Sequence, residues 1–140
     1  MDWKVVYSSL IATMAFGFIF NVPKKAIISG GIIGMIGWVT YVYLSTYKIE
    51  TISSTLISAF IVATLSQILA KYQKLPVTVF SVAGIIPLVP GGLAYETMRY
   101  FVENNYSFAI KYATKTLLIS GAIAFGLIIS GVISQLVKKG

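Results

Sequence analysis

Apolar stretches of about membrane-spanning length follow one another along nearly the whole chain, and only short polar turns separate them. A bilayer core about 30 Å thick is crossed by about 20 apolar helical residues. Backbone N–H and C=O groups find no water in lipid, so such segments must be helical or form a closed barrel. We therefore expect helical spans over about residues 4–21, 26–45, 52–70, 76–102 and 108–137.

Charge is too scarce for a water-soluble fold. Charged residues make up 11% of the 140-residue chain and 57% of its residues are hydrophobic, whereas soluble domains carry roughly a quarter charged residues. The sequence predicts an all-α integral membrane protein with about five transmembrane helices, forming a single transmembrane domain over residues 1–140. A signal peptide is the competing interpretation for Val5–Phe20, but the sequence NVPKK that follows has no small-residue cleavage pattern.

The fourth apolar stretch is interrupted. Its centre, Val82–Tyr95, reads VAGIIPLVPGGLAY, and it follows Pro76. Pro87 and Pro90 each lack a backbone N–H and break a helical hydrogen bond, while Gly91 and Gly92 add backbone freedom. A helix starting at Pro76 would stop near mid-membrane, and we expect the backbone to leave helical geometry between Ile86 and Leu93. Broken helices of this kind mark binding sites in transporters; a proline-kinked helix or a surface loop is the alternative.

Small residues recur on two of the expected spans. Glycines at 30, 34 and 37 share a face of the second span, and Ala122, Gly126, Ser130 and Ser134 recur every four residues on the last. Such faces allow close helix approach in lipid, so we expect them to pack against further helices. The aromatic residues of the second span are interpreted as interface anchors rather than a ligand cage; these are Trp38, Tyr41, Tyr43 and Tyr47.

Several classes of site and partner are disfavoured by composition. The sequence has neither cysteine nor histidine, and its four acids are Asp2, Glu50, Glu96 and Glu103. Common metal sites and histidine-based acid–base catalysis need residues that are missing, so we expect no metal, no cofactor and no enzymatic activity. The basic residues are scattered between the spans, which indicates membrane topology rather than nucleic-acid binding.

The turns between spans suggest an orientation. Five spans place basic pairs at 24–25, 71 and 74, and 138–139 on one side, and all four acids on the other. The positive-inside rule then predicts an outside N-terminus and an inside C-terminus. Whether residues 94–115 cross the membrane or lie on its surface stays open at this level. We also expect Asn21 to cap the second helix, with Pro23 at its start, and Thr51 or Ser53 to cap the third.

Two blocks of sequence resemble the threonine/serine exporter family, and in particular the small membrane subunit of its split form, the YjjB-like type. The first block is FNVPKK after the first span, and the second is a P…F…IPxxPG…AY pattern. The matching positions are Phe20, Asn21, Val22, Pro23, Lys24, Pro76, Phe80, Ile86, Pro87, Pro90, Gly91, Ala94 and Tyr95. The resemblance covers essentially the whole chain in length and span order, and the remaining spans match as generic apolar helices.

The resemblance implies a multi-pass protein of the cell inner (cytoplasmic) membrane. It implies a subunit of a secondary transporter that exports small amino acids, threonine and serine, or dicarboxylates such as succinate. In split members a larger membrane subunit carries a hydrolase-like domain and five spans, and the small subunit supplies the other five. The expected partners are therefore that larger subunit and the lipid bilayer, with a homo-oligomer as the competing assembly.

A substrate site follows if the break is the binding element. Pro87, Pro90, Gly91 and Gly92 would shape it, and the free N–H groups at the start of the following half-helix would bind a small carboxylate substrate. Arg99 would add positive charge, hydroxyls would come from Tyr95, Ser54 and Ser58, and Glu96 is the candidate for proton coupling. The alternative function is a non-transporting membrane scaffold that stabilises a partner, which would need no such interruption.

Overall fold

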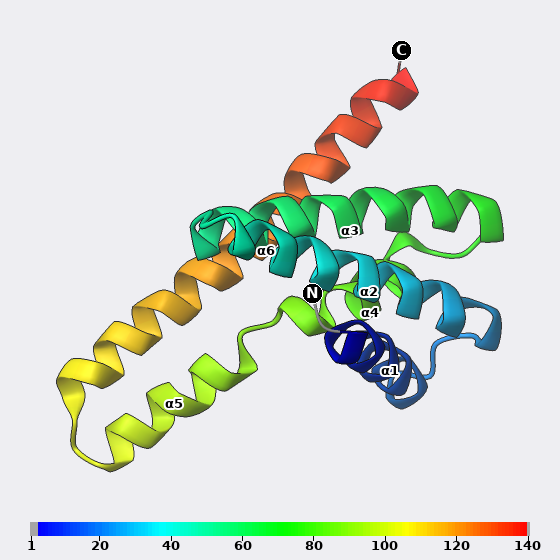
Figure 1. Cartoon of the computed structure of the whole chain (residues 1–140). Coiled ribbons are helices and arrows are strands. Elements are labelled where there is room, and N and C mark those ends of the chain that lie inside the picture. The colour runs from blue at the N-terminus through cyan, green and yellow to red at the C-terminus, as the bar shows by residue number, and fades with distance from the viewer. Residues whose placement is uncertain (1–2, 140) are drawn as a thin grey trace.

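The computed structural model describes residues 3–139, and every regular element in that range is helical. Figure 1 shows the order: α1 (Trp3–Ile19), α2 (Lys24–Thr46), α3 (Thr51–Gln73), α4 (Val77–Gly84), the single 3₁₀ turn η1 (Ile86–Leu88), α5 (Gly91–Val102) and α6 (Tyr106–Lys139). The all-α fold expected from the sequence is confirmed, and the helix ends lie within a few residues of the expected spans.

Three helices are long and apolar enough to cross a membrane: α2, α3 and the Tyr106–Val137 part of α6, with mean hydropathies of 1.7, 1.8 and 2.3. Residues Val77–Leu88 and Gly91–Val102 make a fourth crossing if the pair, bent by 55°, counts as one span. The apolar helix α1 has 17 residues, about 26 Å of helix. Asn21 was expected to lengthen this span, but its φ of 56° places it in the turn beyond α1.

Helix α2 lies at the centre of a bundle formed with α1, α3 and α4 (Figure 1). Its glycines face three different neighbours. A Cβ on Gly30 would lie 3.6 Å from Ala83 of α4, one on Gly34 would meet Thr13 of α1, and one on Gly37 would meet Val62 of α3. The small-residue face predicted for α2 is therefore used inside this chain, because close approach of three helices fills it.

Helix α5 packs mainly against α6, and the two form a hairpin that extends away from the bundle (Figure 1). Stacked aromatic rings join them: the ring of Tyr100 lies 5.3 Å from that of Tyr112 and 5.5 Å from that of Phe108. The turn expected at 103–107 is present, and Asn104 adopts a φ of 63° within it. With 34 residues, α6 is about 51 Å long, so it contacts both α5 and α3.

The residues expected to cap two helices are wrong: Asn21 does not cap α2, and neither Thr51 nor Ser53 caps α3. The N-cap of α3 is Glu50 and that of α2 is Pro23, and neither makes a side-chain cap hydrogen bond. Instead, one non-glycine residue with positive φ ends the preceding helix in four connections: Asn21, Lys48, Lys74 and Asn104. Asparagine tolerates this left-handed conformation, whereas at a lysine it costs about 1–2 kcal/mol.

Candidate functional site

The backbone between α4 and α5 is broken over six residues. α4 ends at Gly84, η1 follows, and Val89 is extended with φ −63° and ψ 130°. Pro90, with φ −81° and ψ 59°, is the centre of an inverse γ-turn in which the Gly91 N–H donates to the Val89 carbonyl at 2.9 Å. The helix resumes at Gly91, two residues earlier than expected from the sequence.

The two glycines after the break belong to the first turn of α5 and are exposed. No glycine in the described range has a positive φ, and a Cβ added at Gly91 or Gly92 would meet no atom within 4 Å. The fold of this chain therefore does not require glycine at either position. A requirement for glycine there would have to come from a molecule that approaches the break.

The start of α5 offers two free hydrogen-bond donors. Ala94 N–H donates to the Pro90 carbonyl at 3.1 Å. Among the residues that the structure describes, the N–H groups of Gly92 and Leu93 have no acceptor. These donors lie at the positive end of the α5 dipole, an arrangement that favours an anion.

A cavity of about 150 Å³ lies against the break. Residues of η1 and Pro90 line one side, with Leu93 and Ile119 from the hairpin. The opposite wall is formed by Trp38 and Tyr41 of α2 and Thr55 of α3. The rings of Trp38 and Tyr41 stack 5.1 Å apart at 21°, and the Thr55 hydroxyl donates to the Thr51 carbonyl at 2.8 Å. This wall combines two aromatic rings with the polar groups of Trp38, Tyr41 and Thr55.

A second hollow of about 350 Å³ adjoins the first. Lys4, Ser8 and Ser9 of α1 line it, together with the same Trp38 and Pro87 that border the cavity at the break. Trp38 and Pro87 thus line both the cavity at the break and this second hollow. Tyr43 and Tyr47 are exposed, and interface anchoring stays the prediction for them, whereas Trp38 and Tyr41 are half-buried at the break. Their spacing of three residues places them on one helix face, but sequence alone does not tell what that face meets.

The serines singled out on α3 are buried but do not line the cavity. Thr55, between Ser54 and Ser58 in sequence, does so instead. The Ser54 hydroxyl lies 3.4 Å from the Ile49 carbonyl. Ser58 is fully buried, and its hydroxyl has no partner among residues 3–139. A buried hydroxyl without a partner costs free energy, so Ser58 remains a candidate contact for a bound molecule.

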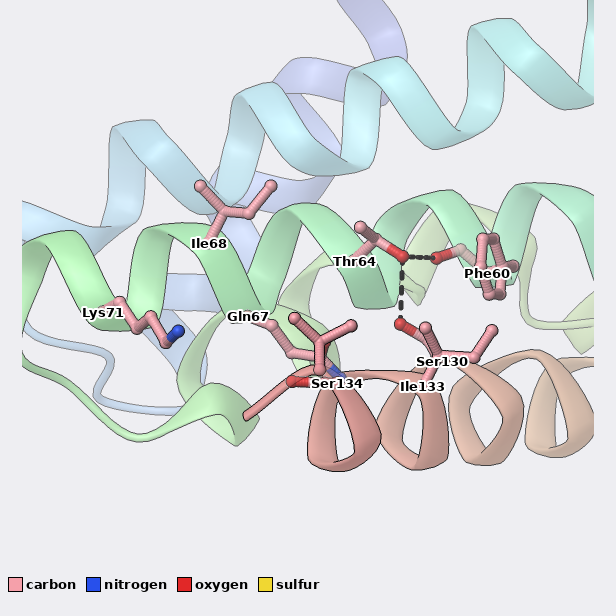
Figure 2. A pocket seen from close by; sticks show the side chains of 9 residues that line it. Phe60, Thr64, Gln67, Ile68, Lys71, Ser130, Ile133 and Ser134 are labelled. Atoms are coloured by element: carbon pink, nitrogen blue, oxygen red, sulfur yellow. Dashed lines mark hydrogen bonds between the residues drawn. The ribbon is translucent and has the colours of Figure 1, made fainter. Parts of the chain in front are cut away.

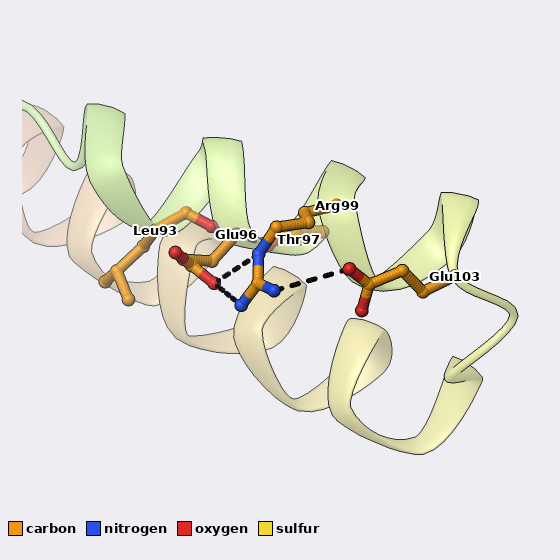
Figure 3. A network of polar contacts seen from close by, with 5 residues as sticks. All are labelled: Leu93, Glu96, Thr97, Arg99 and Glu103. Carbon is orange, nitrogen blue, oxygen red and sulfur yellow. Dashed lines mark hydrogen bonds and ion pairs between the residues drawn. The ribbon is translucent and has the colours of Figure 1, made fainter.

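The charged residues on and next to α5 are paired with one another, and none of them lines the cavity at the break (Figure 3). Arg99 Nε donates to Glu96 Oε2 at 3.0 Å and its Nη1 to Glu103 Oε1 at 3.4 Å. The three side chains are 37–52% exposed, and Tyr95 is 67% exposed. Glu96 and Arg99, three residues apart on α5, thus form an ion pair. Neither these residues nor Tyr95 line the cavity at the break, so their roles in substrate binding and proton coupling stay predictions.

Comparison with known proteins identifies the relatives of this chain. Residues 5–133 match the family described as "Threonine/Serine exporter, ThrE". An uncharacterised protein of Haemophilus influenzae is 30% identical over 141 aligned positions, covering 93% of this chain and 48% of that protein. The chain thus spans about half the length of this curated relative, and no solved structure matches it. Taken with the FNVP block and the proline-broken helix, the match places the chain in the threonine/serine exporter family.

Proposed function

We propose that the chain is the membrane subunit of a secondary transporter in the cell inner membrane, and that the break binds the carboxylate of its substrate. Small amino acids, threonine and serine, are the first candidate substrates, and dicarboxylates such as succinate are the second. The observation that carries the proposal is the pair of free N–H groups of Gly92 and Leu93 beside a cavity. A carboxylate at these donors would gain hydrogen bonds and a favourable dipole.

The size of the cavity favours a small substrate. Its volume of about 150 Å³ is below the roughly 300–1,000 Å³ of pockets for drug-sized molecules. Trp38 and Tyr41 would cover the apolar part of the substrate, and the Thr55 hydroxyl would accept a hydrogen bond from its polar groups. Movement of Trp38 or Pro87 would open the cavity toward the hollow beside Lys4, which is the kind of gating that alternating access requires.

Proton coupling through Glu96 is part of the same proposal. Glu96 holds Arg99 by a charge-assisted hydrogen bond, and a proton on Glu96 would weaken that bond. Arg99 would then be freed to pair with a substrate carboxylate or with Glu103 alone. Replacing Glu96 by Gln mimics the protonated form, and transport by that variant would lose its dependence on a pH gradient if Glu96 carries the proton.

We propose that the functional unit contains a second membrane subunit, larger and carrying a hydrolase-like domain. The similarity of this chain to about half of a longer relative supports this assembly. The outer face of the α5 hairpin supports it too, because Met98 is 63% and Val102 79% exposed. The small-residue face of α2 lends no support, since helices of this chain already fill it. A homo-oligomer is the competing assembly.

The binding site can be tested by filling the cavity. Leu93→Trp places a large ring in the space against Trp38 and Thr55, so we expect it to abolish serine, threonine and succinate efflux from liposomes that hold the chain together with the larger subunit. Leu117→Trp is the matched control, because it is the same substitution at an exposed position of α6. Melting curves of both variants establish that they fold. Wild-type efflux by folded Leu93→Trp would refute the site.

Reconstitution also tests the assembly. The purified chain is placed in liposomes alone and together with the co-expressed larger subunit. We expect no substrate efflux from liposomes that hold the chain alone, and efflux from liposomes that hold both subunits. Equal efflux by the chain alone would refute the two-subunit proposal, and no flux in either case for any of the three substrates would favour the non-transporting scaffold.

A further inference from the structure

A cavity of about 230 Å³ opens between α3 and the C-terminal half of α6, away from the break (Figure 2). The two helices are in close contact at Gly126, where an added Cβ would lie 2.8 Å from the Leu56 carbonyl oxygen. One turn further on, the hydroxyls of Thr64 and Ser130 are hydrogen-bonded at 3.0 Å. These two residues border the cavity, which continues along both helices to Lys71 and Val137.

Polar side chains from both helices point into this space (Figure 2). Gln67 and Lys71 come from α3 and Ser134 from α6, and all three also line a neighbouring hollow of about 250 Å³ near Pro76. Within the part of the chain that the structure describes, none of these three side chains is hydrogen-bonded. The cavity therefore offers one ammonium, one amide and one hydroxyl, all without a partner there.

Positive charge dominates this end of the molecule. Lys25 Nζ donates to the Gln73 carbonyl at 3.2 Å, which brings the start of α2 to the end of α3. Lys74 follows Gln73 in the same turn. The acids within residues 3–139 lie elsewhere, Glu50 at the start of α3 and the other two on or next to α5. No described carboxylate neutralises Lys71, so the cavity favours an anionic ligand.

From this arrangement we infer that the cavity between α3 and α6 binds the headgroup of an anionic phospholipid. Lys71 pairs with the phosphate, and Gln67 and Ser134 donate hydrogen bonds to phosphate or glycerol oxygens. Basic pockets between transmembrane helices bind anionic headgroups in this way. The apolar part of the lining, with Ile68 and Ile133, takes the start of an acyl chain. A zwitterionic amino acid fits less well, because the lining has no carboxylate for its ammonium group.

The test measures lipid binding by the full chain and does not depend on transport. The protein is placed in nanodiscs of phosphatidylcholine with or without phosphatidylglycerol, and bound lipid is counted by native mass spectrometry after release. We expect phosphatidylglycerol to be retained preferentially. Lys71→Gln should weaken that retention roughly fivefold or more, which corresponds to the loss of one lysine at an anionic surface. Lys48→Gln removes the same charge at the other end of α3 and should leave retention unchanged.

A second variant separates the cavity from general surface charge. Ser134→Leu removes a donor and fills the space without changing the net charge, and it should also reduce retention of phosphatidylglycerol. Soluble glycerol 3-phosphate, serine and succinate are added in parallel, and thermal stability is recorded. Equal retention by wild type and Lys71→Gln would overturn the inference. So would stabilisation by serine or succinate that Lys71→Gln removes, since that result would make the cavity a substrate site.

Discussion

The contact of α3 with α6 depends on a glycine, and substituting it should separate the two helices. A Cβ at Gly126 would lie 2.8 Å from Ala59 Cβ, 2.8 Å from the Leu56 carbonyl oxygen and 3.0 Å from the Phe60 nitrogen. Two of these three atoms are backbone, so no side-chain rotation relieves the clash. The helices must part by 0.6 Å to restore ordinary contact, the difference between 2.8 Å and the 3.4 Å at which such contact begins.

This separation sets the size of the effect. Overpacking a core destabilises the fold by about 1–3 kcal/mol, whereas alanine in place of glycine inside a helix stabilises it by roughly 0.5–1 kcal/mol. We therefore expect Gly126→Ala to lower the free energy of unfolding by up to about 2.5 kcal/mol. A shift of 0.6 Å would also stretch the 3.0 Å bond between Thr64 and Ser130 beyond hydrogen-bonding distance.

The same helix provides the control. A Cβ at Gly131 would meet no atom within 4 Å, so Gly131→Ala gains helix propensity without a clash and should raise stability by roughly 0.5–1 kcal/mol. Unfolding of both variants in detergent, followed by circular dichroism during titration with a denaturing detergent, gives the comparison. A Gly126→Ala protein as stable as Gly131→Ala would refute the crossing of α3 and α6.

Three further predictions follow from the same structure. Thr64→Cys with Ser130→Cys should form a disulfide in the otherwise cysteine-free chain, because the two hydroxyls lie 3.0 Å apart; altered gel mobility without reductant checks this, and neither single variant should show it. Gly91→Leu should leave the melting temperature unchanged, because residue 91 is exposed and a Cβ there meets no atom within 4 Å; lost transport by the folded protein would then show that a ligand or partner approaches the break, whereas unfolding would contradict the structure. In intact cells, a membrane-impermeant thiol reagent should label a cysteine at Lys48 and not one at Lys71; the reverse pattern would invert the predicted orientation.

The positions of the helices could be read from the sequence because they depend on local features. Each apolar stretch is bounded by a short polar turn, and lipid leaves helix as the main choice for such a stretch. The expected range 52–70 lies inside α3, and 26–45 lies inside α2. The break was predictable for the same reason, since two prolines three residues apart interrupt helical hydrogen bonding whatever surrounds them.

Contacts between helices were not predictable, because they depend on which faces meet. Gly34 was expected to meet another helix across a small-residue face, but the sequence did not tell that Thr13 of α1 would fill it. For the same reason Thr55 lines the cavity at the break in place of Ser54 and Ser58. Trp38 belongs to this cavity although its aromatic neighbours in sequence suggested the membrane interface.

Packing on the two sides of the break is unequal, and this inequality predicts which side moves. Before the break, a Cβ at Gly84 would lie 2.7 Å from Val62 and 2.8 Å from Ile33, and Phe80 is fully buried, so α4 is tightly held. After the break, Gly91 has open space around it and α5 packs mainly against α6.

Opening free energies are low where buried contacts are few, so we expect α5 to move about Val89–Pro90 while α4 stays fixed. In hydrogen exchange by mass spectrometry, peptides from α5 should exchange faster than peptides from α4. Equal protection of the two helices in the isolated chain would refute a hinge at the break. Protection of α5 that appears only when the larger subunit is present would show that the partner covers α5. In that case the buried contacts that slow exchange would come from the partner.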